Sequence, residues 1–138
     1  MNQNRLEHRL TKDEGLRLKP YHCSAGKLTI GIGRNIEERG ISQAEALFLL
    51  RNDIETCESE LRANFTFFEE LSDIRQEVLL NMCFNLGISR LKQFKKMIQA
   101  LDQEDYARAA REMLDSRWAN QVGKRAVQLA HEMKTGKP

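Results

Sequence analysis

The chain has 138 residues, of which 41% are hydrophobic and 30% are charged, and its formal net charge is +2. This length and this balance are typical of one globular domain with its own core, which excludes a disordered tail and a collagen-like chain. The longest purely apolar run, Ala46–Leu50, is far too short to cross a bilayer, so we expect no stable membrane insertion.

Charge is spread unevenly along the chain. Residues 1–35 and 81–138 carry an excess of lysine and arginine, whereas residues 36–80 are strongly acidic. A basic C-terminal half can attract a nucleic acid, but no aromatic side chains are interleaved with its cations as a platform for bases. We therefore expect no nucleic-acid partner.

The N-terminus and the cysteines bear on the cellular compartment. The first residues contain no apolar stretch of the kind found in a signal peptide, so we expect neither an export signal nor an anchor. Cys23, Cys57 and Cys83 cannot all be paired, and none lies in a Cys-x-x-Cys motif, which favours synthesis in a reducing compartment. The three histidines show no ligand spacing, so we expect no metal and no cofactor.

The first elements in chain order are a helix and a hairpin. Residues 3–13 have a helical pattern that is stopped by Gly15, and Pro20 disfavours its continuation. In residues 27–33 apolar side chains alternate with polar residues or glycine, and the turn residues Ser24–Gly26 precede them. This alternation after a turn predicts a β-hairpin.

The rest of the chain is predicted to be helical. Capping boxes at Ser42–Glu45 and Thr66–Glu69 indicate helix starts. The expected helices are 42–63, 72–86, 90–101, 103–115 (started by Asp102) and 122–134 (ended by Gly136). The second half of 72–86 is apolar almost all round, so we expect it to be the central buried helix, with Cys83 as a small core residue. One hairpin in an otherwise helical chain predicts a mostly helical α+β fold.

Two local features point to chemistry. Glu14 stands at the C-terminal end of the first predicted helix, where basic residues are usual. This negative helix end favours the protonated carboxyl group that a general acid needs, although a solvated acid at a small energetic cost gives the same pattern. In the predicted strand, Thr29 shares its face with Gly31 and Gly33, so either a ligand can lie close against this face or the strand is a sterically thin edge.

These residues resemble the active-site signature of the bacteriophage-type lysozymes, glycoside hydrolase family 24. That signature is a Glu, eight residues, an Asp or Cys, five residues and a Thr, and here it matches Glu14, Cys23 and Thr29. The segment Asn81–Gly87 and the segment Ser116–Gln121 with Arg125 close behind also match, so the resemblance covers nearly the whole chain.

The resemblance implies a single lysozyme domain over residues 1–138 with a two-lobed fold. A small hairpin lobe and a long connecting helix would comprise about residues 14–63, and residues 1–13 with 64–138 would form the helical lobe. By analogy with a His–Asp pair of the family, we expect an ion pair between Arg34 and Asp53.

The resemblance further implies an endolysin that hydrolyses the β-1,4 bond between N-acetylmuramic acid and N-acetylglucosamine in peptidoglycan and so lyses the host cell. Glu14 would be the general acid. Cys23 and Thr29 would orient the attacking water with inversion, or Cys23 would attack the sugar with retention. Phe84 matches a cleft residue and Arg125 matches an arginine beside the catalytic Glu. Family sugar-contacting positions fall on Asn35, Met97 and Glu112.

The implied partners are peptidoglycan glycan strands and a holin, which would release a monomeric enzyme from the host cytoplasm to the cell wall. Three other functions fit part of the sequence. A lytic transglycosylase would use Glu14 alone on the same bond, and a cysteine peptidase or amidase would use Cys23 on the peptide part of the wall. A catalytically inactive wall-binding module is disfavoured by the presence of Glu14 and Thr29.

Overall fold

A computed structural model describes all 138 residues and confirms the predicted mostly helical α+β fold, with eight α-helices and one small sheet. The chain divides into two compact units, Met1–Leu49 and Leu50–Pro138, and helix α2 (Gln43–Asn64) begins in the first and ends in the second. The assignment of residues 1–13 to the helical lobe stays a prediction. None of the helices combines the length and the apolar character needed to span a membrane.

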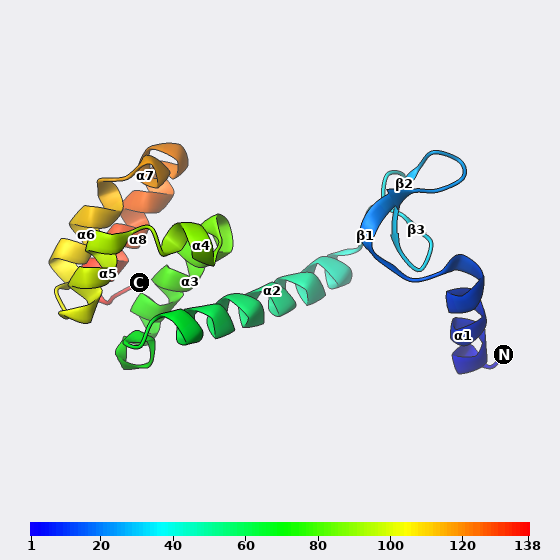
Figure 1. The fold of residues 1–138 in the computed structure, drawn as a ribbon, viewed down its shortest axis with the longest axis horizontal. Helices are drawn as coiled ribbons and strands as arrows, with labels where there is room; N and C mark the ends of the chain where they lie inside the picture. The colour runs from blue at the N-terminus through cyan, green and yellow to red at the C-terminus, as the bar shows by residue number, and fades with distance from the viewer. The chain divides into compact units, whose positions relative to one another are not determined.

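The first unit contains one helix and three short strands (Figure 1). These are α1 (Gln3–Glu14), β1 (Arg17–His22), β2 (Leu28–Gly31) and β3 (Arg34–Asn35). Helix α1 starts where the Asn2 side chain accepts a hydrogen bond from the Arg5 N–H at 2.9 Å, and Gly15 ends it as predicted. The antiparallel sheet has the order β1-β2-β3, so the predicted hairpin is confirmed. Strand β3 was not predicted because a two-residue strand leaves no alternation to recognise.

An ion pair joins the sheet to the start of α2 within the first unit. Arg34 donates to the two carboxylate oxygens of Glu45 at 2.9 and 2.8 Å. Glu45 also accepts from the Ser42 N–H at 2.8 Å, and the Ser42 hydroxyl accepts from the Glu45 N–H at 3.1 Å, which confirms the predicted capping box. The predicted Arg34–Asp53 pair is wrong: Arg34 is held at the first turn of α2, and Asp53 lies about two turns further along the helix.

The second unit is a helical bundle (Figure 1). Beyond the end of α2 it contains η1 (Phe68–Glu70, a 3-10 helix), α3 (Asp73–Leu86), α4 (Ile88–Leu91), α5 (Lys95–Asp102), α6 (Tyr106–Leu114), α7 (Arg117–Val122) and α8 (Lys124–Thr135). Helix α8 packs against α3, α6 and α7, and α6 also packs against α5. Helix α4 packs against α3, so each of the helices α3 to α8 packs against at least one other helix of this unit.

The predicted central position belongs to α8, which packs against three other helices, but the hydrophobic core also includes the second half of α3. Its side chains Val78, Leu79, Met82 and Cys83 are all buried. Burial, together with the neighbouring Cys57 thiol, raises the pKa of Cys83 to about 12. Cys83 is thus a small apolar core residue with little tendency to ionise.

Several predicted helix boundaries are wrong. The Thr66–Glu69 box caps no α-helix, because a 3-10 turn follows and Glu69 pairs instead with Arg62. The helix predicted over 90–101 is two helices, α4 and α5, separated by a turn. Helix α6 starts after Asp105, whose side chain accepts the capping hydrogen bond at 3.1 Å, and not after Asp102. The short helix α7 was not predicted as a separate element.

Candidate active site

Glu14 is the last residue of α1 and its side chain is exposed. The Gly15 N–H donates to the Thr11 carbonyl at 2.9 Å and ends the helix at this point. The Glu14 carboxylate lies directly against the backbone of Gly33, since a Cβ atom added to Gly33 would lie 2.9 Å from Oε2 of Glu14. The helix end therefore delivers the carboxylate to the turn between β2 and β3.

Within the first unit, no ion pair involves Glu14. Its acidic neighbour Asp13 is paired with Arg9, one helical turn earlier, at 3.0 Å. Arg34, which lies next to Gly33 in the chain, is held by Glu45. The nearest charged neighbours of Glu14 in the chain and in the sheet are thus engaged with other partners.

Cys23 lies in the tight turn between β1 and β2. Its N–H donates to the Lys27 carbonyl at 2.9 Å, and its carbonyl accepts from the Gly26 N–H at 2.8 Å. Thr29 on β2 is the one buried side chain of the first unit, with 3% of its surface exposed. The Thr29 hydroxyl donates to the Lys27 carbonyl at 2.8 Å, which fixes it beside the turn.

This turn favours the ionised form of Cys23. Hydrogen bonds from the backbone N–H groups of Lys27 and Ala25 are the main causes that lower the pKa of the Cys23 thiol below its ordinary value. Burial opposes them in part, and a weaker contribution from the Thr29 hydroxyl lowers the pKa further. A hydroxyl carries a single proton, so Thr29 can give it either to the Lys27 carbonyl or to a thiolate at Cys23. The structure therefore brings Cys23 and Thr29 together as one polar group.

The other two predicted site residues belong to the second unit. Phe84 on α3 is 45% exposed, more than the neighbouring core positions of the same helix. Arg125 on α8 donates to the Asn81 side-chain oxygen from two nitrogens, at 2.9 and 2.6 Å. Asn81 thus positions Arg125, although sequence reasoning gave Asn81 no role.

Asn85, in the same segment Asn81–Gly87, also accepts a hydrogen bond from a distant side chain. The Trp118 indole N–H donates to the Asn85 side-chain oxygen at 2.8 Å. Asn81 and Asn85 therefore link the two C-terminal segments that match the family. The sequence signal for these two contacts was the presence of amide side chains within the apolar stretch of α3. A polar group in such a place needs a hydrogen-bond partner.

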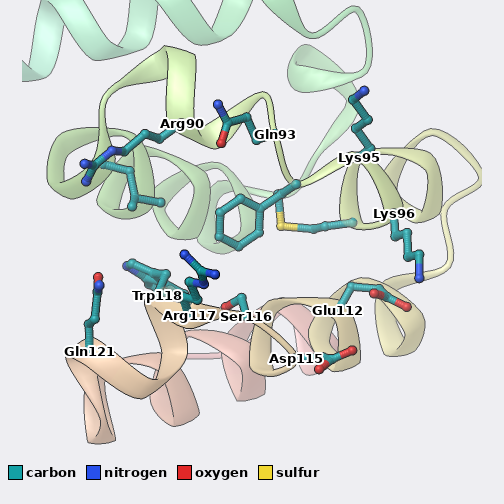
Figure 2. A pocket seen from close by; sticks show the side chains of 13 residues that line it. Arg90, Gln93, Lys95, Lys96, Glu112, Asp115, Ser116, Arg117, Trp118 and Gln121 are labelled. Carbon is teal, nitrogen blue, oxygen red and sulfur yellow. The ribbon is translucent and has the colours of Figure 1, made fainter.

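A pocket of about 630 Å³ lies between α4, α5, α6 and α7 of the second unit (Figure 2). Phe94 and Trp118, which pack edge to face at 6.2 Å between ring centroids, form part of its apolar wall. Its charged lining side chains are Arg90, Lys95, Lys96, Glu112, Asp115 and Arg117. Cations and carboxylates around an apolar wall suit a ligand that carries both signs of charge.

The three positions that the resemblance assigned to sugar contact have different environments. Glu112 lines this pocket with its carboxylate (Figure 2), whereas Met97 is fully buried and contributes only to the pocket's apolar side. Asn35 lies on β3, where its side-chain oxygen accepts from the Glu38 N–H at 3.0 Å.

Comparison with known proteins defines the class of this protein. The phage lysozyme family model matches residues 11–132. The chain is 26% identical to probable T4-type lysozyme 1 of Dictyostelium discoideum, over 95% of this chain and 94% of that protein. It is 31% identical to an endolysin of Acyrthosiphon pisum secondary endosymbiont phage 1, over 81% of this chain and 77% of that protein. It is also 26% identical to the pre-baseplate central spike protein Gp5 of Enterobacteria phage T4, over 92% of this chain but 27% of that protein.

The chain therefore belongs to the phage lysozyme family. Its most similar relatives include T4-type lysozymes and an endolysin, and it is an enzyme of the lysozyme type that hydrolyses peptidoglycan.

Proposed function

We propose that this lysozyme hydrolyses the β-1,4 bond between N-acetylmuramic acid and N-acetylglucosamine. The observation that carries the proposal is the arrangement of the first unit, where a carboxyl group with no ion-pair partner in that unit lies at a helix end, against the sheet that also holds Cys23 and Thr29. Glycoside hydrolysis needs a protonated acid at the leaving oxygen and a second polar group that acts at the anomeric carbon.

In this reaction Glu14 donates its proton to the leaving glycosidic oxygen. The Cys23 thiolate accepts a proton from a water molecule that Thr29 helps to orient, and this water attacks the anomeric carbon with inversion. The lowered pKa of Cys23 supports the role of the thiolate. Direct attack by the Cys23 sulfur would give retention instead, and the anomeric form of the first product distinguishes the two routes.

The central test is the variant Glu14→Gln. It keeps the size and hydrogen-bonding capacity of the side chain but removes the proton donor, so we expect the rate to fall on the order of 10²–10⁴-fold with an unchanged fold. The measurement is the release of reducing sugar ends from purified peptidoglycan, with circular dichroism as the control for folding. Near-normal activity of a folded Glu14→Gln would contradict the assignment.

Analysis of the digest by mass spectrometry tests the bond that is cut. New reducing N-acetylmuramic acid ends are expected for a muramidase. Anhydro-muramic ends would indicate a lytic transglycosylase, and new free amines would indicate a peptidase or amidase. Either of these last two results would overturn the proposal.

We also propose that the enzyme acts as an endolysin on glycan strands of the host wall. It would accumulate as a monomer in the bacterial cytoplasm and reach the wall when a holin opens the membrane. The similarity to a phage endolysin supports this proposal. Expression in a bacterium should cause lysis only when a holin is co-expressed, and lysis without a holin would contradict the dependence.

A further inference from the structure

We propose that Gly33 is a positioning residue for the general acid, because the missing Cβ atom at Gly33 leaves the space in which the Glu14 carboxylate rests. This inference depends on the proposed role of Glu14. The relevant contacts all lie within the first unit: a Cβ on Gly33 would stand 2.9 Å from Oε2, 3.1 Å from Cδ and 3.2 Å from Cγ of Glu14. The two carbon–carbon contacts, to Cδ and Cγ, are shorter than the optimal separation of about 3.5–4.0 Å between carbon atoms.

The atoms in conflict belong to the far end of a flexible side chain. A Cβ at Gly33 would therefore displace the Glu14 carboxylate by rotation of its side chain, and the backbone of the sheet would not have to move. The size of the side chain at position 33 thus decides whether the Glu14 carboxylate can lie here. Gly33 is not part of a packed core, so this effect on Glu14 is separate from any effect on core packing. A reacting group that is misplaced by about 1 Å can cost on the order of 10²-fold in rate, so this control of position matters for catalysis.

Gly33 also adopts a left-handed backbone conformation, with φ of +68°. This conformation alone disfavours other residues, so a loss of activity after substitution could come from backbone strain. The chain contains a matched control for this effect. Gly31, two residues earlier, has φ of +71°, but a Cβ added there would meet no atom within 4 Å. Gly31→Ala and Gly33→Ala therefore impose similar backbone strain and differ in the contact with Glu14.

The experiment is a double-mutant cycle with Glu14→Asp, whose side chain is shorter by one methylene. In the wild-type background, Glu14→Asp withdraws the carboxyl group and lowers kcat. In the Gly33→Ala background, the shorter aspartate side chain also avoids the added methyl group. We therefore expect the factor by which Glu14→Asp lowers kcat to be at least about 10-fold smaller in this background than in the wild type. In the Gly31→Ala background the loss caused by Glu14→Asp should equal that in the wild type.

Gly33→Ala alone should lower kcat on the order of 10²-fold with little change in KM, because proton donation is an interaction of the transition state. The thermal stabilities of Gly33→Ala and Gly31→Ala should be similar. If Gly33→Ala does not fold, Gly33→Asn replaces it, paired with Gly31→Asn, because asparagine adopts the left-handed conformation more readily and carries the same Cβ.

The inference is overturned if the effects of Glu14→Asp and Gly33→Ala on kcat are independent of each other. If Glu14→Asp costs the same factor in the Gly33→Ala, Gly31→Ala and wild-type backgrounds, then Gly33 serves the backbone conformation only. Glu14→Gln separates this failure from a failure of the proposed function. An active Glu14→Gln would overturn the role of Glu14 itself, whereas an inactive Glu14→Gln together with an additive cycle would overturn only the role of Gly33.

Discussion

The first unit, Met1–Leu49, carries Glu14, Cys23 and Thr29 and buries only the last of these three side chains, whereas every buried hydrophobic side chain belongs to Leu50–Pro138. Directional interactions hold the first unit: strand hydrogen bonds, the capping box of α2 and the Arg34–Glu45 pair. The second unit is held mainly by the non-directional burial of apolar surface in its core.

This difference has a consequence for mutations. Directional contacts place a few polar groups accurately without contributing much to global stability, whereas a packed core contributes several kcal/mol at single positions. Substitutions in the first unit should therefore reduce activity more than stability, and core substitutions in the second unit should do the reverse. The following experiments test this separation.

Among these experiments, we expect the largest effect from substitutions of Cys23, which should change the reaction rate. Cys23→Ser replaces a thiol that ionises readily by a hydroxyl that does not, so we expect the rate to fall on the order of 10²–10⁴-fold with an unchanged melting temperature. Cys23→Asp should preserve activity and move the pH optimum downward, because a carboxylate with an ordinary pKa of about 3.9 is already charged at mildly acidic pH.

The pH–rate profile of the wild type sharpens this prediction. Because the turn lowers the pKa of Cys23, the rising limb of kcat/KM should have its midpoint below the ordinary thiol value of about 8.5. An alkylating reagent should modify Cys23 before Cys57 and Cys83, since burial raises the pKa of both of these thiols. Superimposable profiles for the wild type, Cys23→Ser and Cys23→Asp would mean that Cys23 takes no part in the reaction.

The second effect concerns the core of the second unit. Leu79 on α3 is fully buried, so Leu79→Ala should lower the free energy of unfolding by about 2–5 kcal/mol through lost burial and the cavity that remains. Leu114→Ala on α6 is the control, because this leucine is 45% exposed and should cost much less. Urea denaturation measures both values. Equal losses of unfolding free energy in the two variants would contradict the expected separation between effects on activity and effects on stability. A large drop in kcat of the folded Leu79→Ala enzyme would contradict it as well.

The smallest effect concerns the Arg34–Glu45 pair of the first unit. Hydrogen bonds from Arg34, and then from Ser42, lower the pKa of Glu45 to about 2. The ordinary pKa of a glutamate is about 4.3. The folded state therefore favours the carboxylate, and this stabilisation is present above about pH 4.3 and is lost as the pH falls toward 2. Glu45→Gln should remove a small stabilisation at neutral pH and none at the acidic limit.

Hydrogen exchange of the amide groups of β2 and β3 measures this effect, because it reports on the first unit alone. Glu55→Gln on α2 is the control, since Glu55 forms no ion pair. Added salt should reduce the difference in amide protection between the wild type and Glu45→Gln, because Arg34 and Glu45 are both partly exposed and salt screens their attraction. Protection that is the same in both proteins at neutral pH would mean that the pair does not hold the sheet.

Much of this molecule could be predicted from its sequence because the deciding interactions are local. The Ser42–Glu45 box joins residues three positions apart, and Gly15, Gly87 and Gly136 end α1, α3 and α8 within one turn of the last helical carbonyls. The hairpin and the apolar character of α3 follow from periodicity over a few residues. The spacing of Glu14, Cys23 and Thr29, together with the segments Asn81–Gly87 and Ser116–Gln121, indicated a glycosidase of this family, and the family model confirms this membership.

Tertiary structure decided which distant groups meet. The 90–101 pattern is helical throughout, but α4 ends at Leu91 and α5 begins only at Lys95, after Phe94, whose ring packs against Trp118. The sequence resemblance suggested Asp53 as the partner of Arg34, whereas the path of the chain places Arg34 beside Glu45. The contact of Glu14 with Gly33 and the hydrogen bonds that Asn81 accepts from Arg125 and Asn85 accepts from Trp118 likewise join residues far apart in the chain. Such contacts depend on the packing of whole elements, and no rule based on spacing within one helix or strand contains that information.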